Sequence, residues 1–77
     1  MTRRYAVIRV AWDDEAKVWF VEESDIEGLA AEESSLELLR AKLPGMVQDL
    51  LQEVEGRPDE IELDLIAYAR DRVRIAA

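Results

Sequence analysis

The side chains best suited to chemistry in this chain are carboxylates, because the sequence contains neither histidine nor cysteine. Asp13, Asp14 and Glu15 are consecutive, and carboxylate oxygens are the ligands that Mg²⁺ prefers. A metal-dependent nuclease needs carboxylates that converge from separate elements of the fold. Three acids elsewhere in the chain could complete such a set: Asp25, Glu62 and Asp64. Consecutive turn residues rarely converge on one point, so we expect no catalytic residue, metal ion or cofactor. A Mg²⁺-dependent nuclease is the alternative.

The aromatic residues favour a binding role. Trp19 and Phe20 are adjacent, so on a β-strand their side chains point to opposite faces. The sequence predicts one helix, which covers only one face of a sheet. One ring is then left for solvent or a partner, and an exposed apolar patch of that size usually marks an interface. We therefore favour a protein interface over a purely structural role for these rings and for Trp12.

The charges are unevenly distributed along the chain. The net charge is −8, yet residues 12–37 hold ten of the 18 acids and a single base, Lys17. An acidic balance repels phosphate backbones, so direct DNA binding is not expected. Glu22, Asp25 and Glu27 could instead complement a basic protein surface, or they could form a solubilising rim.

Arg70, Arg72 and Arg74 recur at every second residue, which places them on one side of a strand. Such a stripe could contact nucleic acid, or it could pair with acids of a second copy in a homodimer or higher homo-oligomer. The candidate partner-binding residues are therefore Trp12, Trp19, Phe20, Glu22, Asp25, Glu27, Arg70, Arg72 and Arg74.

These residues are positioned by five predicted elements. Residues 5–11 and 18–21 are rich in β-formers and flank an acidic turn at 13–16, which predicts a hairpin. A turn follows in which Gly28 can adopt a positive φ, and residues 29–32 are predicted as a short third strand.

A helix follows the third strand. Ser34 with Glu37 forms a capping box, and Ser35 could cap instead. Apolar residues recur at steps of three or four from Leu36 to Val54, on one helical face. Pro44 predicts a kink or restart within residues 43–45. Gly56 and Pro58 predict the end of the helix.

Residues 61–68 alternate in polarity and predict a final strand. We expect it to continue through Val73 and Ile75 as one long strand, with a break near Asp71 as the alternative. The fold class is therefore α+β, in the order β-β-β-α-β. We expect a single domain of residues 1–77, with a small antiparallel-type sheet and one helix packed on a face.

No apolar run is long enough for a secretory signal or a membrane span. The hydrophobic content of 49% also distinguishes the chain from a disordered acidic tail. We expect a cytoplasmic protein with no membrane association.

Three motifs in order resemble the HicB-like antitoxin superfamily, and most of all its short bacterial domains of unknown function. They are W-D-D-E-A-K-V-W from Trp12, S-D-I-E-G-L from Ser24, and S-L-E-x-L from Ser35. Asp25, Ile26 and Gly28 match the second turn of the HicB pattern, with Glu27 where proline is usual. The resemblance covers most of residues 5–66.

This resemblance implies a degenerate ribonuclease-H-like fold without catalytic function. It also implies an antitoxin role, in which the protein neutralises a small basic ribonuclease of the HicA type by masking its RNA-binding surface. Many HicB proteins carry a further DNA-binding domain; we expect it to be absent here, and with it transcriptional autoregulation. A solitary homo-oligomer without a toxin is the alternative.

Overall fold

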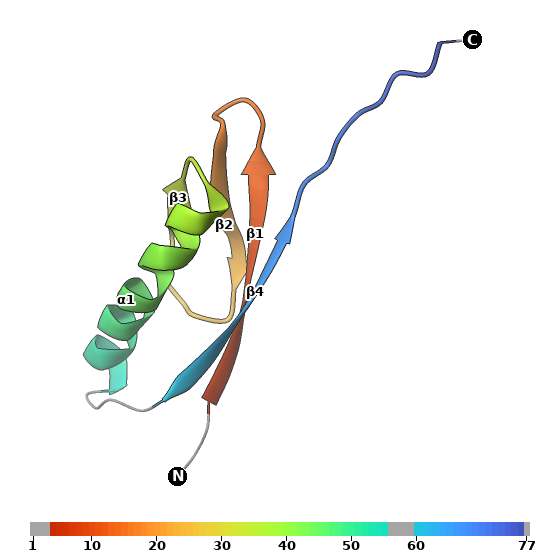
Figure 1. Cartoon of the computed structure of the whole chain (residues 1–77). Coiled ribbons are helices and arrows are strands. Elements are labelled where there is room, and N and C mark those ends of the chain that lie inside the picture. Colours follow the sequence, from red (N-terminus) through yellow and green to blue (C-terminus); the bar gives the residue numbers. More distant parts are fainter. Residues whose placement is uncertain (1–3, 56–59, 77) are drawn as a thin grey trace.

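The computed structural model describes residues 4–55 and 60–76. Its elements are β1 (Arg4–Asp13), β2 (Val18–Ser24), β3 (Glu32–Glu33), α1 (Leu36–Glu55) and β4 (Ile61–Tyr68). The predicted α+β class and element order are confirmed (Figure 1). The four strands form one sheet in the order β3-β2-β1-β4. The sheet is mixed, because β4 runs parallel to β1 whereas the other neighbours are antiparallel.

The β1–β2 hairpin closes with the predicted acidic turn. Asp13 Oδ1 accepts the backbone N–H groups of Glu15 and Ala16, at 3.0 and 3.2 Å. The N–H of Lys17 donates to the Asp13 carbonyl at 2.8 Å, and Lys17 has a φ of 59°. Such left-handed geometry is uncommon outside glycine. Both strands are longer than predicted: β1 gains residues at both ends, and β2 gains residues 22–24 at the end away from the turn, where the ladder continues past a bulge.

A bulge interrupts the hairpin ladder further from the turn. Val10 lies opposite Val21 and Arg9 lies opposite Glu23, so the register shifts between Arg9 and Val10. Glu22 is therefore the extra residue on β2, and a bulge of this kind re-aims side chains locally.

The connection from β2 to the helix corrects the predicted third strand. Gly28 has a φ of +85°, as predicted, but only Glu32–Glu33 form β3. Leu29 is instead buried in the loop, where its N–H donates to the Ile26 carbonyl at 3.3 Å. The predicted strand over residues 29–32 is therefore wrong in most of its length. Leu29 lies in a turn and buries its side chain in the core, so it does not pair with β2.

The helix begins after Ser35. Ser35 Oγ accepts the N–H of Leu38 at 3.1 Å, so Ser35 is the cap, the second of the two predicted alternatives. The predicted restart within residues 43–45 is wrong, since α1 continues through Pro44. Pro44 and Gly45 are both exposed, so the lost backbone bond lies on the solvent side. The predicted stop at Gly56 and Pro58 lies outside the described residues.

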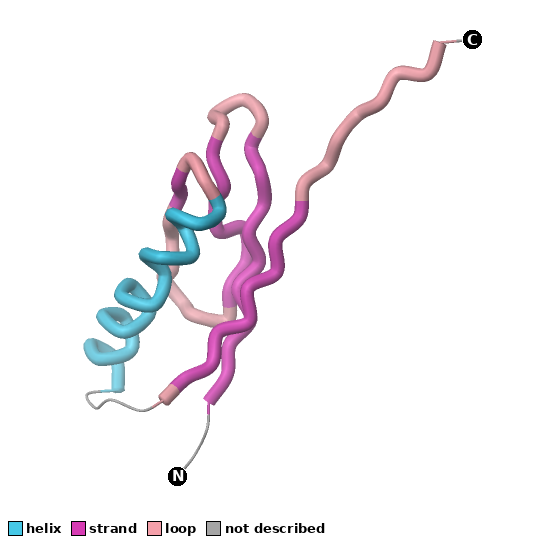
Figure 2. Tube along the Cα trace, viewed as in Figure 1, coloured by secondary structure: helices cyan, strands magenta, loops and turns pink. Residues whose placement is uncertain are grey.

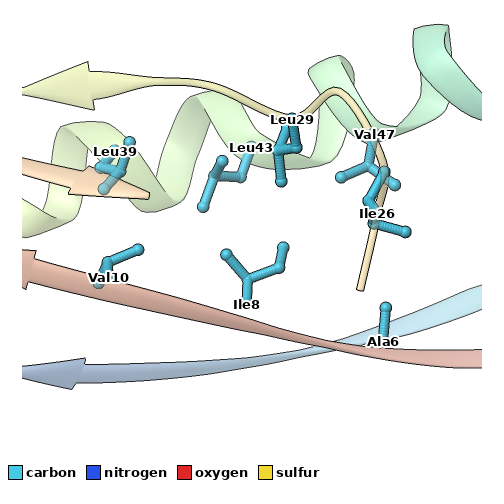
Figure 3. Close-up of a cluster of buried hydrophobic side chains, with 8 residues drawn as sticks. All are labelled: Ala6, Ile8, Val10, Ile26, Leu29, Leu39, Leu43 and Val47. Carbon is cyan, nitrogen blue, oxygen red and sulfur yellow. The ribbon is translucent and has the colours of Figure 1, made fainter. Parts of the chain in front are cut away.

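The helix packs on one face of the sheet and encloses the core there (Figure 3). The core comprises Ala6, Ile8, Val10, Ile26, Leu29, Leu39, Leu43 and Val47. The predicted apolar helical face is confirmed at its three buried leucine and valine positions. Leu36 and Leu50 are half-buried beside them, and the side chain of Val54 lies outside the described residues.

The last strand is shorter than predicted. β4 pairs with β1 from Arg4–Ile61 to Ala11–Tyr68, and β1 itself ends at Asp13. Residues 69–76, which we call the arm, have no assigned strand structure and extend away from the sheet (Figure 2). The predicted strand through Val73 and Ile75 is therefore wrong, because the ladder with β1 ends at the pair Ala11–Tyr68 and the arm then diverges from the sheet (Figure 2).

Candidate protein-interaction site

One face of the sheet carries no helix among the described residues. Alternate residues of β1 point to this face, since Ala6, Ile8 and Val10 point to the helix (Figure 3). Register partners share a face, so the neighbouring strands contribute the remaining residues of this surface, which we call the open face. Its residues are Tyr5, Val7, Arg9, Ala11, Phe20, Glu22, Glu23, Glu32, Glu62, Asp64, Ile66 and Tyr68.

Two aromatic residues flank the central strand β1 at the end of the open face nearest the hairpin turn. Ala11 lies opposite Phe20 on β2 and beside Tyr68 on β4. Ala11 is only 5% exposed although it points away from the helix, because the two rings shield it. Phe20 is half-buried and Tyr68 is 43% exposed. Ala11 is thus a small residue between two large register neighbours.

Tyr68 is held in place by a contact that spans three strands. Its hydroxyl donates to the carboxylate of Glu22, with oxygens at 2.5 and 2.6 Å. This hydrogen bond raises the pKa of the Tyr68 phenol above its ordinary value, with desolvation and the negative charge of Glu22 adding to the shift. Glu22 is the bulge residue, so the register shift in β2 is what turns its carboxylate toward the open face.

The open face mixes apolar and acidic side chains. On β4, Ile66 is 45% exposed, whereas Glu62 and Asp64 are acids; Tyr5, on β1, is 62% exposed. Exposed acids lie at Glu23 and Glu32 on one side and at Asp64 on the other, with Arg9 between them. The open face therefore combines aromatic and apolar contact area with negative charge, which suits a basic protein surface.

Trp12 and Trp19 lie on the other side of the sheet. They are register partners on the face of Val10 and Val21, and their ring centroids are 5.6 Å apart at 57°. Trp19 packs against the core. Trp12 Nε1 donates to Asp14 Oδ1 at 3.3 Å. Each residue is half-buried, so Trp19 closes the core beside the hairpin turn and Trp12 packs on Trp19.

Within the hairpin turn, the carboxylate of Asp14 contacts both Trp12 and Lys17. The Lys17 ammonium donates to Asp14 Oδ1 at 2.9 Å, and this bond, with that from Trp12, lowers the pKa of the Asp14 carboxyl. Both side chains are largely exposed, so the ion pair adds little to stability.

Asp25 and Glu27 lie at the opposite end of the hairpin, in the loop after β2. Asp25 extends the β1 ladder: its N–H donates to the Val7 carbonyl at 3.0 Å, and its carboxylate accepts the Val7 N–H at 2.8 Å. Glu27 is exposed in the same loop. Asp25 therefore has a structural task that the sequence did not reveal.

The structure thus divides the nine candidate residues among separate surfaces. Only Phe20 and Glu22 lie together on the open face, and Arg70, Arg72 and Arg74 are exposed on the arm. Tyr68, Ile66 and Tyr5 complete the open face but were not among the candidates. Only the pairing of β4 with β1 places these three residues on one face, and the sequence alone does not determine that pairing.

The acidic turn provides no metal site in residues 4–55 and 60–76. No three Asp or Glu side chains there are grouped so that they could hold a metal ion. The Asp13 carboxylate is already engaged by two turn N–H groups. Across the same described residues, no helix has the length and apolarity needed to cross a membrane.

The fold defines a class of protein: a small α+β domain whose mixed sheet is covered by one described helix and open on the other face. Within that class, residues 5–77 match the family described as Domain of unknown function (DUF1902), and the chain belongs to this family.

A solved structure agrees with the fold. The hypothetical protein TTHA1013 from the extremely thermophilic bacterium Thermus thermophilus is 39% identical, with a TM-score of 0.66. The alignment covers 94% of this chain and 100% of that one. None of the curated proteins compared with this chain matches it.

Proposed function

We propose that this protein is a non-catalytic binding module of the cytoplasm that acts as an antitoxin. It would neutralise a small basic ribonuclease of the HicA type by covering that enzyme's RNA-binding surface. The observation that supports this most is the open face, where Phe20 and Tyr68 lie partly exposed beside the acids of β2. The resemblance of the two turns and the helix start to HicB-like proteins supports the same role.

The mechanism is steric and electrostatic. The carboxylates of Glu23 and Glu32 attract a basic surface and speed the encounter. The ring of Phe20 then supplies the desolvated contact that slows dissociation, since aromatic residues dominate the energetics of many interfaces. No bond is made or broken in this process.

The direct experiment is co-expression with the product of the neighbouring open reading frame. We expect that product to arrest growth alone and to be relieved and bound by this protein. A neighbour that is neither toxic nor bound would remove the proposal.

Two variants locate the contact on the open face. Phe20→Ala should weaken toxin binding by about thirtyfold, the effect of losing a central aromatic contact. Glu32→Lys should slow association, and the effect should fade at high salt. Asp49→Lys, on the exposed side of α1, makes the same charge change away from the open face and should leave binding unchanged. Equal effects of Glu32→Lys and Asp49→Lys would place the contact elsewhere.

A second candidate, a homo-oligomer without a toxin, is favoured by the arm. Its apolar side chains Val73 and Ile75 are 80% and 87% exposed. Recovery of the native protein as a pure oligomer, with no small basic companion, would favour this candidate over the antitoxin.

A further inference from the structure

The arm is an extended segment without strand structure, and Arg70, Asp71 and Arg72 at its start line one hollow with Trp12 and Asp14 of the hairpin. All of residues 69–76 for which burial is described are exposed, and the molecule measures 59 Å along its longest axis against 21 and 19 Å across it. The arm leaves the sheet in continuation of β4 (Figure 1). Ordering such a segment costs conformational entropy, and its exposed side chains gain little burial within the described chain to offset that cost.

The arm has the pattern of a strand with two unlike sides. Arg70, Arg72 and Arg74 alternate with Val73 and Ile75. On a strand, the arginines would share one side and the two apolar residues the other.

The sheet offers a matching edge at β4. β4 is the outermost strand on that side, so a row of its backbone donors and acceptors has no described strand to pair with. An edge of this kind is a template for another strand. β4 contains no proline or lysine to block such pairing.

The two sides of β4 complement the two sides of the arm. Leu63 and Leu65 point toward the helix and are half-buried at the edge of the core. Asp64 points to the open face and is exposed. An antiparallel arm that places Ile75 and Val73 beside the two leucines also places Arg74 beside Asp64, because residues opposite each other share a face.

We infer that the arm is an exchanged strand: it pairs antiparallel with β4 of a second copy of this chain and makes a two-fold dimer. With the axis at residue 69, Asp64 lies opposite Arg74, Leu65 opposite Val73, and Leu63 opposite Ile75. Both arms are paired at once, as two-fold symmetry requires, and each sheet gains a fifth strand. This inference does not depend on the proposed toxin and is tested on the purified chain alone.

A charge exchange tests the pairing. Wild-type protein should sediment as a dimer. Asp64→Arg and Arg74→Asp should each raise the dimer dissociation constant about tenfold, since each creates two like-charge contacts by symmetry. The double variant Asp64→Arg/Arg74→Asp should restore the wild-type constant. Circular dichroism of each variant checks that the fold is retained, and failure of the double variant to recover would overturn the inference.

Cross-linking tests the register, because the chain has no cysteine of its own. Asp64→Cys/Arg74→Cys should form a disulfide-linked dimer on oxidation. Within one extended chain these positions are about 30 Å apart, far beyond disulfide reach. Asp64→Cys/Asp71→Cys, with the second cysteine on the other side of the arm, should cross-link poorly.

Two further outcomes would overturn the inference. One is a chain that stays monomeric at every concentration while its arm arginines retain a single-stranded RNA oligonucleotide. The other is a dimer that Phe20→Ala dissociates and the charge exchange leaves intact, which would place the contact on the open face.

Discussion

At the scale of single residues, the contact that organises the open face is the hydrogen bond from Tyr68 to Glu22. It joins the outermost strand β4 to β2 across the central strand. Ala11 lies between the two strands in the register, and Glu22 is the bulge residue of β2. The hydrogen bond thus joins two residues that are 46 positions apart in the sequence.

The pKa of the Tyr68 phenol reports this contact. Glu22→Gln removes the charged acceptor, so the pKa should fall toward the ordinary value of 10.0. An absorbance titration of ionised tyrosine measures it, and a Tyr5→Phe background leaves Tyr68 as the single tyrosine. Identical midpoints with Glu and Gln at position 22 would contradict the assignment.

The raised pKa of Tyr68 also determines how the stability of the fold changes with pH. The folded state holds the phenol proton more tightly than the unfolded state does, so the bond stabilises the fold below pH 10.0. That stabilisation is lost as the pH rises through the raised pKa of the folded protein. The difference in unfolding free energy between wild type and Tyr68→Phe should therefore shrink at high pH.

At the scale of elements, local chemistry predicted the hairpin turn, the helical face and the positive φ of Gly28. These features depend on neighbours within a few residues. The end of β4 did not follow from its sequence, because the alternation runs on through Val73 and Ile75 while the ladder with β1 ends at the pair Ala11–Tyr68. The residues of the open face could not be predicted for the same reason. Which side chains lie together there depends on the strand order β2-β1-β4, and the periodicity of the sequence does not encode that order.

At the start of the helix, two adjacent serines differ in their contribution to stability, because only Ser35 caps the helix. Ser35→Ala should lower the unfolding free energy by about 1 kcal/mol, because the N–H of Leu38 loses its acceptor. Ser34→Ala, one residue earlier and exposed, should change it by less than about 0.5 kcal/mol. Urea denaturation of both variants measures the difference. A larger loss of unfolding free energy for Ser34→Ala than for Ser35→Ala would contradict this assignment and favour the predicted capping box of Ser34 with Glu37.

At the scale of the whole molecule, the core is one-sided and small. A 77-residue chain has a stability of about 4–12 kcal/mol. Leu39 is fully buried, whereas its neighbour Leu38 is 53% exposed on the same helix. The two leucines therefore provide a matched test of how much the single helix–sheet layer contributes.

Leu39→Ala should lower the unfolding free energy by roughly 2–5 kcal/mol, since it leaves a cavity in the core. Leu38→Ala should cost less than about 0.5 kcal/mol if its face meets solvent. Urea denaturation at several protein concentrations gives both values and shows any contribution from association. Similar losses for the two variants would mean that the outer face of α1 is also covered.

The parallel pairing of β1 with β4 governs when the protein can fold during synthesis. Arg4 pairs with Ile61, so during synthesis β1 must wait for β4, which lies far along the chain. The hairpin and helix can form on the nascent chain, but the ribosome must release residues 61–68 before the central strand gains its second neighbour. Pairing between strands so far apart in the sequence is slow. Until β4 pairs with it, the exposed edge of β1 can aggregate or bind a chaperone.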